Sequence, residues 1–245
     1  MKDSPAISVI IPALNEEKLI VQTVSQFTSL LKEKYKIELI ISDGGSTDKT
    51  LELCKNHSEI IEQAKPGEKQ NIPQGRNAGA KAASGSLFYF FNADTLINEI
   101  DTFFKLTLST FNDDRIFAAT CRIRVFPDEE ILKDKLFHSF YNGYVQILNK
   151  IGMGMGRGEC HIIRKDIFDS VNGYNESLSA GEDYDLFRRI RKLGKIKFLR
   201  KLVVYESPRR YRKFGYRKVI GDWIRNSLSV IFKNKSVSKV WEAVR

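Results

Sequence analysis

Short apolar runs alternate with segments of helical spacing through the first 91 residues of the chain. Four runs predict strands, at 7–11, 37–41, 60–61 and 87–91. Apolar or small residues at helical spacing predict helices at 16–34, 48–56 and 75–83. Thr47 stands where a side chain can cap the second of these helices. Strands that are apolar throughout and alternate with helices are typical of a parallel sheet covered on both faces.

The pattern is less regular in the second half of the chain. Strands are expected at 117–125, 160–163 and 196–205. Helical spacing is found at 131–151, 181–193 and 216–233, and a glycine-dense loop occupies 153–158. The whole pattern predicts an α/β fold whose regular sheet lies in the N-terminal half.

The composition adds limits on the class of protein. With 42% hydrophobic and 29% charged residues among 245, the chain has enough apolar residues for a full core and suits one α/β domain or a domain with a modest appendage. Its three cysteines are scattered, which argues against a disulfide framework or a zinc site. No apolar run approaches the roughly 20 residues of a spanning helix, and no secretion signal is found. We expect a cytoplasmic protein, soluble or peripheral at the cytoplasmic face of a membrane.

The positive charge is concentrated near the C-terminus. Residues 188–245 contain 19 Lys or Arg against three acidic residues, whereas the chain as a whole carries a net charge of +10. The first 187 residues are therefore net acidic. An anionic partner is expected for the C-terminal quarter, and nucleic acid, a diphosphate and a membrane surface all have the required charge.

Three polar turns follow predicted strands, at 12–16, 43–48 and 92–95. Ligands of open α/β sheets bind beyond the carboxyl ends of the strands, so these turns are expected to meet at one site. Asp43, before Gly44 and Gly45, can accept hydrogen bonds from a base N–H or from ribose hydroxyls. A plain turn or a helix cap is the alternative role for such a residue.

Further charged residues are candidates for chemistry. Asp94 follows an apolar strand and can bind Mg²⁺ or Mn²⁺ when substrate phosphates complete the coordination, although capping of a following helix is the alternative. Segment 181–185 gathers three acids, which suits a general base but also an ordinary helix start. Arg76 and the cationic loop 207–213 can bind a diphosphate, or the loop can simply be solvated.

Taken in order, five stretches resemble the inverting glycosyltransferases of family 2, which have the GT-A fold. They are IPALNEE, SDGGSTD, GRNAGAKAASG, FFNADT and GEDYDLFRRIRKLG. Together they span about residues 7–207. The following SPRRYRKFGY is similar to the tail of some family members.

The resemblance implies roles for individual residues. Asp183 would be the general base, Asp94 would hold Mn²⁺ or Mg²⁺, and Asn92 would replace the first acid of the usual Asp-x-Asp motif without supplying its charge. The donor nucleotide-sugar would be bound by a set drawn from all five stretches and the tail: Pro12, Leu14, Glu16, Asp43, Arg76, Asn92, Ala93, Asp94, Glu182, Arg209 and Arg210.

The resemblance also implies an organisation and a reaction. Residues 1–207 would form the GT-A domain, with a Rossmann-like nucleotide-binding half at 1–96 and an acceptor half at 97–207. The enzyme would move a sugar from a UDP-, GDP- or dTDP-sugar to an acceptor hydroxyl on a glycan or a lipid-linked molecule. A catalytically lapsed sugar-nucleotide binder and a sugar-phosphate nucleotidyltransferase are the alternatives. A nucleic-acid-binding module is disfavoured because it leaves the three polar turns without a purpose and no such motif is present.

The tail at 208–245 is expected to be a basic amphipathic helix. It could lie on an anionic membrane and present a lipid-linked acceptor, or pack against the domain or a second subunit of a homodimer.

Overall fold

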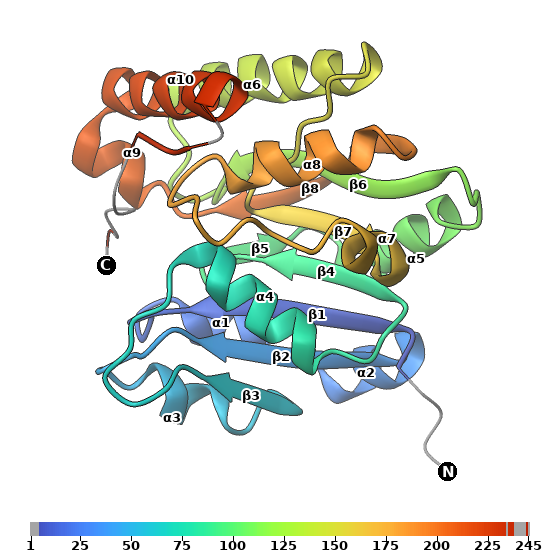
Figure 1. The fold of residues 1–245 in the computed structure, drawn as a ribbon. Coiled ribbons are helices and arrows are strands. Elements are labelled where there is room, and N and C mark those ends of the chain that lie inside the picture. The colour runs from blue at the N-terminus through green and yellow to red at the C-terminus, as the bar shows by residue number, and fades with distance from the viewer. Residues whose placement is uncertain (1–4, 234, 238–243, 245) are drawn as a thin grey trace.

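The computed structural model describes residues 5–233, 235–237 and 244, and within this part the chain forms one curled, mixed sheet of eight strands flanked by helices (Figure 1). The strand order is β3-β2-β1-β4-β7-β6-β8-β5. The strands are β1 (Ile7–Ala13), β2 (Ile37–Asp43), β3 (Ile60–Gln63), β4 (Leu87–Phe91), β5 (Thr95–Ile97), β6 (Ile116–Val125), β7 (Cys160–Arg164) and β8 (Lys195–Glu206).

The helices lie on both faces of the sheet and at one end of it (Figure 1). They are α1 (Ile20–Val24), α2 (Ser29–Tyr35), α3 (Thr50–Cys54), α4 (Ile72–Ala82), α5 (Ile100–Thr110), α6 (Leu132–Lys150), α7 (Lys165–Ser170), α8 (Glu182–Arg191), α9 (Arg209–Phe214) and α10 (Tyr216–Lys233). Helices α6 and α10 lie side by side at that end. None of the described helices combines the length and apolarity needed to cross a membrane.

The sheet is parallel in its first half and mixed in its second. Strands β3, β2, β1 and β4 pair in parallel, as the alternation of strands and helices predicts. Strand β7 is antiparallel to both β4 and β6, β8 is parallel to β6, and β5 is antiparallel to β8. The carboxyl ends of β1, β2 and β4 therefore share one edge, where the three polar turns follow.

Strand β4 shows why the central strands are apolar throughout. All five of its residues are buried. Tyr89 and Phe91 belong to the core on one face of the sheet, and Phe88 and Phe90 belong to the core on the other. Helix α4 packs closely on β1, because a Cβ at Gly79 would lie 2.5 Å from the Cγ2 of Ile10. The small residues of the predicted helix 75–83 serve this contact.

Two local predictions are wrong. The segment 16–34 is not one helix but two, because Thr28 adopts an extended backbone and its side chain accepts a hydrogen bond from the Leu31 N–H, which starts α2. Thr47 does not cap the helix after it. That helix begins at Thr50, and the nearby acceptor is Asp48, whose Oδ1 accepts from the Thr50 N–H at 2.9 Å.

The remaining elements agree with the pattern to within a few residues, and four were not expected. Strand β5 and helices α5, α7 and α9 are too short or too irregular in pattern to stand out in the sequence. Helix α10 has the predicted range of 216–233. Residues 234, 238–243 and 245 of the predicted tail, and residues 1–4 of the predicted domain, lie outside the described residues.

Candidate active site

A cavity of about 590 Å³ lies at the carboxyl edge of β1, β2 and β4 and extends toward α6, α8 and α9. Of the residues predicted to bind the donor or to act in catalysis, all but one line this cavity: Pro12, Leu14, Glu16, Arg76, Asn92, Ala93, Asp94, Glu182, Asp183, Arg209 and Arg210. Asp43 itself is buried behind the wall, and its neighbours Ser42 and Gly44 line the cavity. The structure thus brings the predicted residues to one cleft.

Arg76 connects the two acidic motifs of the cleft. Its side chain is 1% exposed. Nη1 donates to Glu182 Oε1 at 2.9 Å, and Nη2 donates to Asn92 Oδ1 at 3.1 Å and to the Gly158 carbonyl at 2.8 Å. The guanidinium also lies 5.2 Å from the ring centroid of Tyr174. Arg76 therefore fixes the start of α8 against the turn after β4, and both of its terminal nitrogens are bonded to protein oxygens.

Arg209 connects two other parts of the cleft. Nη1 lies 2.8 Å from Glu16 Oε2, and Nη2 lies 2.9 Å from Glu16 Oε1 and 3.1 Å from Asp94 Oδ2. Helix α9, which follows β8, thereby reaches the turn after β1 and the turn after β4. The predicted tail contributes directly to the site. Asp94 does not cap a following helix, because the element that follows it is β5.

Asp183 is half-buried at the start of α8 and lines the cleft. Burial and the neighbouring charge of Glu182 raise the pKa of Asp183 to about 7, although the Tyr184 N–H, at 2.8 Å from Oδ1, acts in the opposite direction. A carboxylate whose pKa lies near neutral pH is suited to accept a proton during a reaction.

The pKa of Asp94 is raised to about 6. Burial is the main cause, the charge of Arg209 opposes it, and the charges of Glu16 and Glu159 add to it. The cleft is therefore rich in carboxylates that a cation can stabilise.

The turn after β2 holds Asp43 in a fixed position. Its Oδ2 accepts hydrogen bonds from the Gly45 N–H at 3.1 Å and the Ser46 N–H at 3.0 Å. Gly45 has a φ of +97°, and a Cβ there would lie 2.5 Å from the Glu68 carbonyl oxygen, so the turn requires glycine.

Three buried polar atoms near this turn have no hydrogen-bond partner among the residues that the structure describes. They are Asp43 Oδ1, Ser42 Oγ and Gln70 Oε1. The last two flank Gly75, where a Cβ would lie 3.9 Å and 3.8 Å from them. Because buried polar groups are normally bonded, this end of the cleft has the character of a site that a polar ligand completes.

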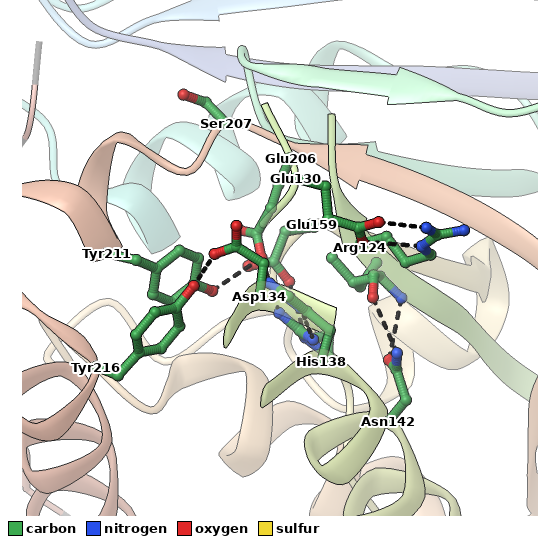
Figure 2. Close-up of polar contacts among 12 residues, drawn as sticks. Arg124, Glu130, Asp134, His138, Asn142, Glu159, Glu206, Ser207, Tyr211 and Tyr216 are labelled. Atoms are coloured by element: carbon green, nitrogen blue, oxygen red, sulfur yellow. Dashed lines mark hydrogen bonds and ion pairs between the residues drawn. The ribbon is translucent and has the colours of Figure 1, made fainter. Parts of the chain in front are cut away.

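A second group of polar residues lies deeper in the cleft. Arg157 is almost fully buried, and its guanidinium lies 3.2 Å from Glu159 Oε2, 3.1 Å from Glu206 Oε1 and 4.7 Å from the ring centroid of Tyr141. The Tyr211 hydroxyl donates to Glu206 Oε1 at 2.9 Å, a bond visible in Figure 2. We call these five residues the inner cluster, and all of them line the cleft.

Protonation in the inner cluster follows from burial and from Arg157. Burial and the charge of Glu159 raise the pKa of Glu206 well above its ordinary range. Burial acts in the same direction on Glu159, but the charge of Arg157 lowers its pKa. Burial and the charge of Arg157 lower the pKa of His138, whose Nδ1 lies 3.4 Å from Arg157 Nη1 and so accepts. These shifts favour an ion pair between Arg157 and Glu159, a protonated Glu206 and a neutral His138.

Sequence reasoning missed the inner cluster, although weak signals for it exist. Arg157 and Glu159 lie in or next to the glycine-dense loop 153–158, and Glu206 is one residue beyond the predicted strand 196–205. Tyr141 lies in the aromatic-rich helix. Nothing in the local pattern indicates that β7 runs antiparallel between β4 and β6 and so brings this loop to the cleft.

The residues around Asp94 suit a divalent cation that the substrate helps to bind. Among the described residues no group of three or more His, Cys, Asp or Glu side chains could hold a metal by itself. Asp94 nonetheless presents one carboxylate to the cleft, and Mg²⁺ commonly uses one or two carboxylates together with substrate phosphates. Asn92 is oriented by Arg76 and adds no charge. The donor set fits a metal bound together with a diphosphate.

The chain is similar to known glycosyltransferases. The "Probable glycosyltransferase YdaM" of Bacillus subtilis (strain 168) is 26% identical over 250 residues, which cover 95% of this chain and 58% of that protein. The chain thus spans little more than half of that relative.

Two solved structures have the same fold. The mannosyltransferase PcManGT from Pyrobaculum calidifontis, in complex with GDP-Man and Mn²⁺, matches with a TM-score of 0.72 and 17% identity, covering 96% of this chain and 66% of that one. S. aureus TarS 1–349 in complex with UDP-GlcNAc matches with a TM-score of 0.61 and 17% identity, covering 82% of this chain and 58% of that one. The predicted GT-A fold is confirmed.

A family model described as "Glycosyl transferase family 2" matches residues 8–171, about two thirds of the chain. This span includes the turns after β1, β2 and β4 and the loop that carries Arg157 and Glu159. The chain belongs to glycosyl transferase family 2.

Proposed function

We propose that the protein is an inverting glycosyltransferase that moves a sugar from a nucleotide-sugar to an acceptor hydroxyl, with Asp183 as the general base. The observation that carries the proposal is the pair of arginine bridges. Arg76 joins the Asn92 turn to Glu182, next to Asp183, and Arg209 joins Asp94 to Glu16. Acids remote in sequence are thereby held in one cleft of suitable size.

The proposed reaction is a single displacement. The carboxylate of Asp183 takes the proton of the acceptor hydroxyl while the oxygen of that hydroxyl attacks the anomeric carbon. The bond from that carbon to the diphosphate oxygen breaks, and the nucleoside diphosphate leaves with the electron pair. Attack from the face opposite the leaving group inverts the anomeric configuration. The raised pKa of Asp183 supports this role, since a base is most effective when its pKa is near the working pH.

The leaving diphosphate would be held by Asp94, through a bound Mn²⁺ or Mg²⁺, and by Arg209 or Arg210. When bound, the metal would offset negative charge on the diphosphate. Arg209 already lies against Asp94, so it can turn to a phosphate oxygen without leaving the cleft. The complex of the mannosyltransferase PcManGT with GDP-Man and Mn²⁺ supports this assignment.

The nucleotide would lie at the turn after β2. Ser42 and Gln70 line the cleft there and Asp43 lies just behind its wall, each with one unpaired polar atom, and the glycines leave room for a flat base. The similar structures hold GDP-Man and UDP-GlcNAc, so guanosine and uridine donors are both candidates for this chain.

A donor screen tests the proposal. We expect purified protein to show a thermal shift with one of the UDP-, GDP- or dTDP-sugars in the presence of Mn²⁺, and to hydrolyse that donor slowly without an acceptor. Binding of a donor without hydrolysis or transfer to any acceptor would instead support the lapsed-binder alternative. Absence of a shift with every donor would contradict the proposed function. Family membership disfavours the nucleotidyltransferase alternative.

Removal of the metal tests the role of Asp94. We expect EDTA to weaken donor binding by tenfold or more, since a metal–phosphate contact worth about 1.4 kcal/mol already gives a factor of ten. Asp94→Ala should weaken donor binding in Mn²⁺ and make it insensitive to EDTA. Donor affinity that is unaffected by EDTA and by Asp94→Ala would remove the metal from the proposal.

A further inference from the structure

Helix α6 exposes a continuous apolar face. Its inner side packs on the domain through buried residues that include His138, Asn142 and Val145. Its outer side carries six large apolar side chains, counting the residue that follows the helix, that are between 43% and 74% exposed. They recur every three or four positions and so form one stripe, the α6 outer face: Leu132, Leu136, Phe140, Tyr144, Ile147 and Ile151.

The fold by itself does not account for this face. Single exposed apolar side chains are normal on a protein surface, and Leu30 on α2 is such a case with 76% exposure. Six exposed apolar side chains in one stripe along five turns of a helix are different, because a contiguous apolar surface marks a contact with a partner or a membrane. Ile220 and Ile224 of the neighbouring α10 are also exposed.

The surroundings of the α6 outer face are strongly cationic. Helices α6 and α10 contain seven Lys or Arg and two acids, Asp134 and Asp222, and three further acids, Asp128 to Glu130, precede α6. Asp134 is buried against Arg212 and Tyr216, as Figure 2 shows for Tyr216, and Asp222 pairs with Lys218 at 3.1 Å. Exposed cations flank the stripe on α6 itself and on α10: Lys133, Lys135, Lys150, Arg217 and Arg225.

Helix α6 separates this face from the cleft. Tyr141 of α6 lines the cleft and stacks on Trp223 of α10, with ring centroids 5.0 Å apart. Phe140 and Tyr144, on adjacent positions of the same helix, are exposed on the outer side. Whatever binds the α6 outer face therefore lies one helix thickness from the inner cluster. Figure 1 shows α6 and α10 together as the end layer of the molecule.

We propose that the α6 outer face docks on an anionic lipid bilayer, with α6 lying in the plane of the interface and the cations of α6 and α10 contacting lipid headgroups. An apolar stripe bordered by Lys and Arg is the pattern of interfacial helices. A second copy of the chain is disfavoured as the occupant, because two surfaces with the same excess of positive charge repel each other. The sequence pointed to the helix 216–233 for membrane contact. The structure assigns the apolar part of that contact to α6.

Vesicle flotation with the full chain tests the proposal. The probes are vesicles of phosphatidylcholine with and without phosphatidylglycerol, at low and high salt. We expect the protein to float with the anionic vesicles, less so at high salt, and not with pure phosphatidylcholine. The double substitution Phe140→Glu with Ile147→Glu should lower partitioning by about tenfold or more, since it removes two inserted side chains and adds charge.

Leu30→Glu is the matched control, because it makes the same kind of change at an equally exposed site on α2. It should float like the unsubstituted chain. Donor binding and thermal stability of the double variant should stay near normal, which separates loss of docking from loss of fold and from failure of the proposed function. No flotation of the unsubstituted chain, equal flotation of the double variant, or a stable dimer that the double substitution dissociates would each overturn the proposal.

Discussion

The two ends of the cleft differ in how their polar groups are satisfied. At the turn after β2, Asp43, Ser42 and Gln70 each keep a buried polar atom without a partner among the described residues. In the inner cluster, Arg157, Glu206 and Tyr211 are bonded to one another. The first end is incomplete without a ligand, whereas the second is already organised. Between them lie Asp94 and Asp183, whose pKa values are raised by burial and by neighbouring carboxylates.

This difference indicates where ligand binding supplies energy and where the protein supplies geometry. The free energy of pairing the unsatisfied atoms is available for donor binding, because an unpaired buried polar group costs about 1–3 kcal/mol. The inner cluster gains nothing comparable from a ligand. Its ion pair can instead hold that end of the cleft rigid.

The largest effect is expected at the residue between the two ends. Asp183→Asn should lower kcat by about 10²–10⁴-fold, since it removes the proposed general base, while donor affinity changes little. Initial rates and donor titration measure the two quantities. Asp166→Asn, at the exposed first turn of α7, is the control and should be near normal. Turnover that survives in Asp183→Asn would remove the residue from the role.

The next effect concerns the bridge that places Asp183. Arg76→Met should lower the free energy of unfolding by about 3–5 kcal/mol, because it leaves the carboxylate of Glu182 buried without its partner. Urea denaturation measures the loss. Arg115→Met breaks a surface ion pair and should cost under about 1 kcal/mol. If the two variants are equally stable, the bridge does not organise the cleft.

A smaller effect is expected at the incomplete end. Asp43→Asn keeps an oxygen for the turn but removes the carboxylate charge that lies just behind the proposed nucleotide end of the cleft, so donor KM should rise about 5- to 100-fold, equivalent to about 1–3 kcal/mol, with kcat little changed. Asp48→Asn, five positions further along the same turn, where the carboxylate accepts from the Thr50 N–H, is the control, and its donor KM should stay near normal. An unchanged KM in Asp43→Asn would contradict the contrast between the two ends.

The smallest effect is on stability as a function of pH. Because the pKa of Asp183 is raised to about 7 in the folded protein, the native state holds a proton that the unfolded chain has released, and stability falls as pH rises from about 4 to 7. At pH values above 7, Asp183→Asn removes this loss of stability and should raise Tm by about 2–4 °C for each kcal/mol recovered. Scanning calorimetry at pH 5 and pH 8 measures it. A lower Tm than the unsubstituted chain at pH 8 would contradict the raised pKa.

The same residue sets the expected pH profile of activity. Below about pH 7 the carboxyl of Asp183 holds its proton, so kcat/KM should fall by about tenfold per pH unit, and it should level off above. This fall in kcat/KM below pH 7 should be absent from the residual activity of Asp183→Asn.

The sequence by itself determined the regular half of the fold and most of the cleft lining. Short, aromatic-rich apolar runs such as 87–91 favour strands buried on both faces, and residues that follow parallel strands meet at one edge of the sheet. For that reason Pro12, Asn92 and Asp94 could be predicted from the sequence as site residues. The order of the motifs indicated the family.

Only the tertiary structure decided which charges pair and which surfaces stay exposed. Arg76 could as well have bound a phosphate, and Arg157 and Glu206 were not recognised, because their partners depend on β7 and β8 joining the sheet out of sequence order. Helix α6 reads as an ordinary amphipathic helix, yet its apolar stripe faces away from the core. Local periodicity reports whether a segment is a helix or a strand. The burial of a side chain and its choice of partner depend on residues far away in the chain, so no local sequence pattern encodes them.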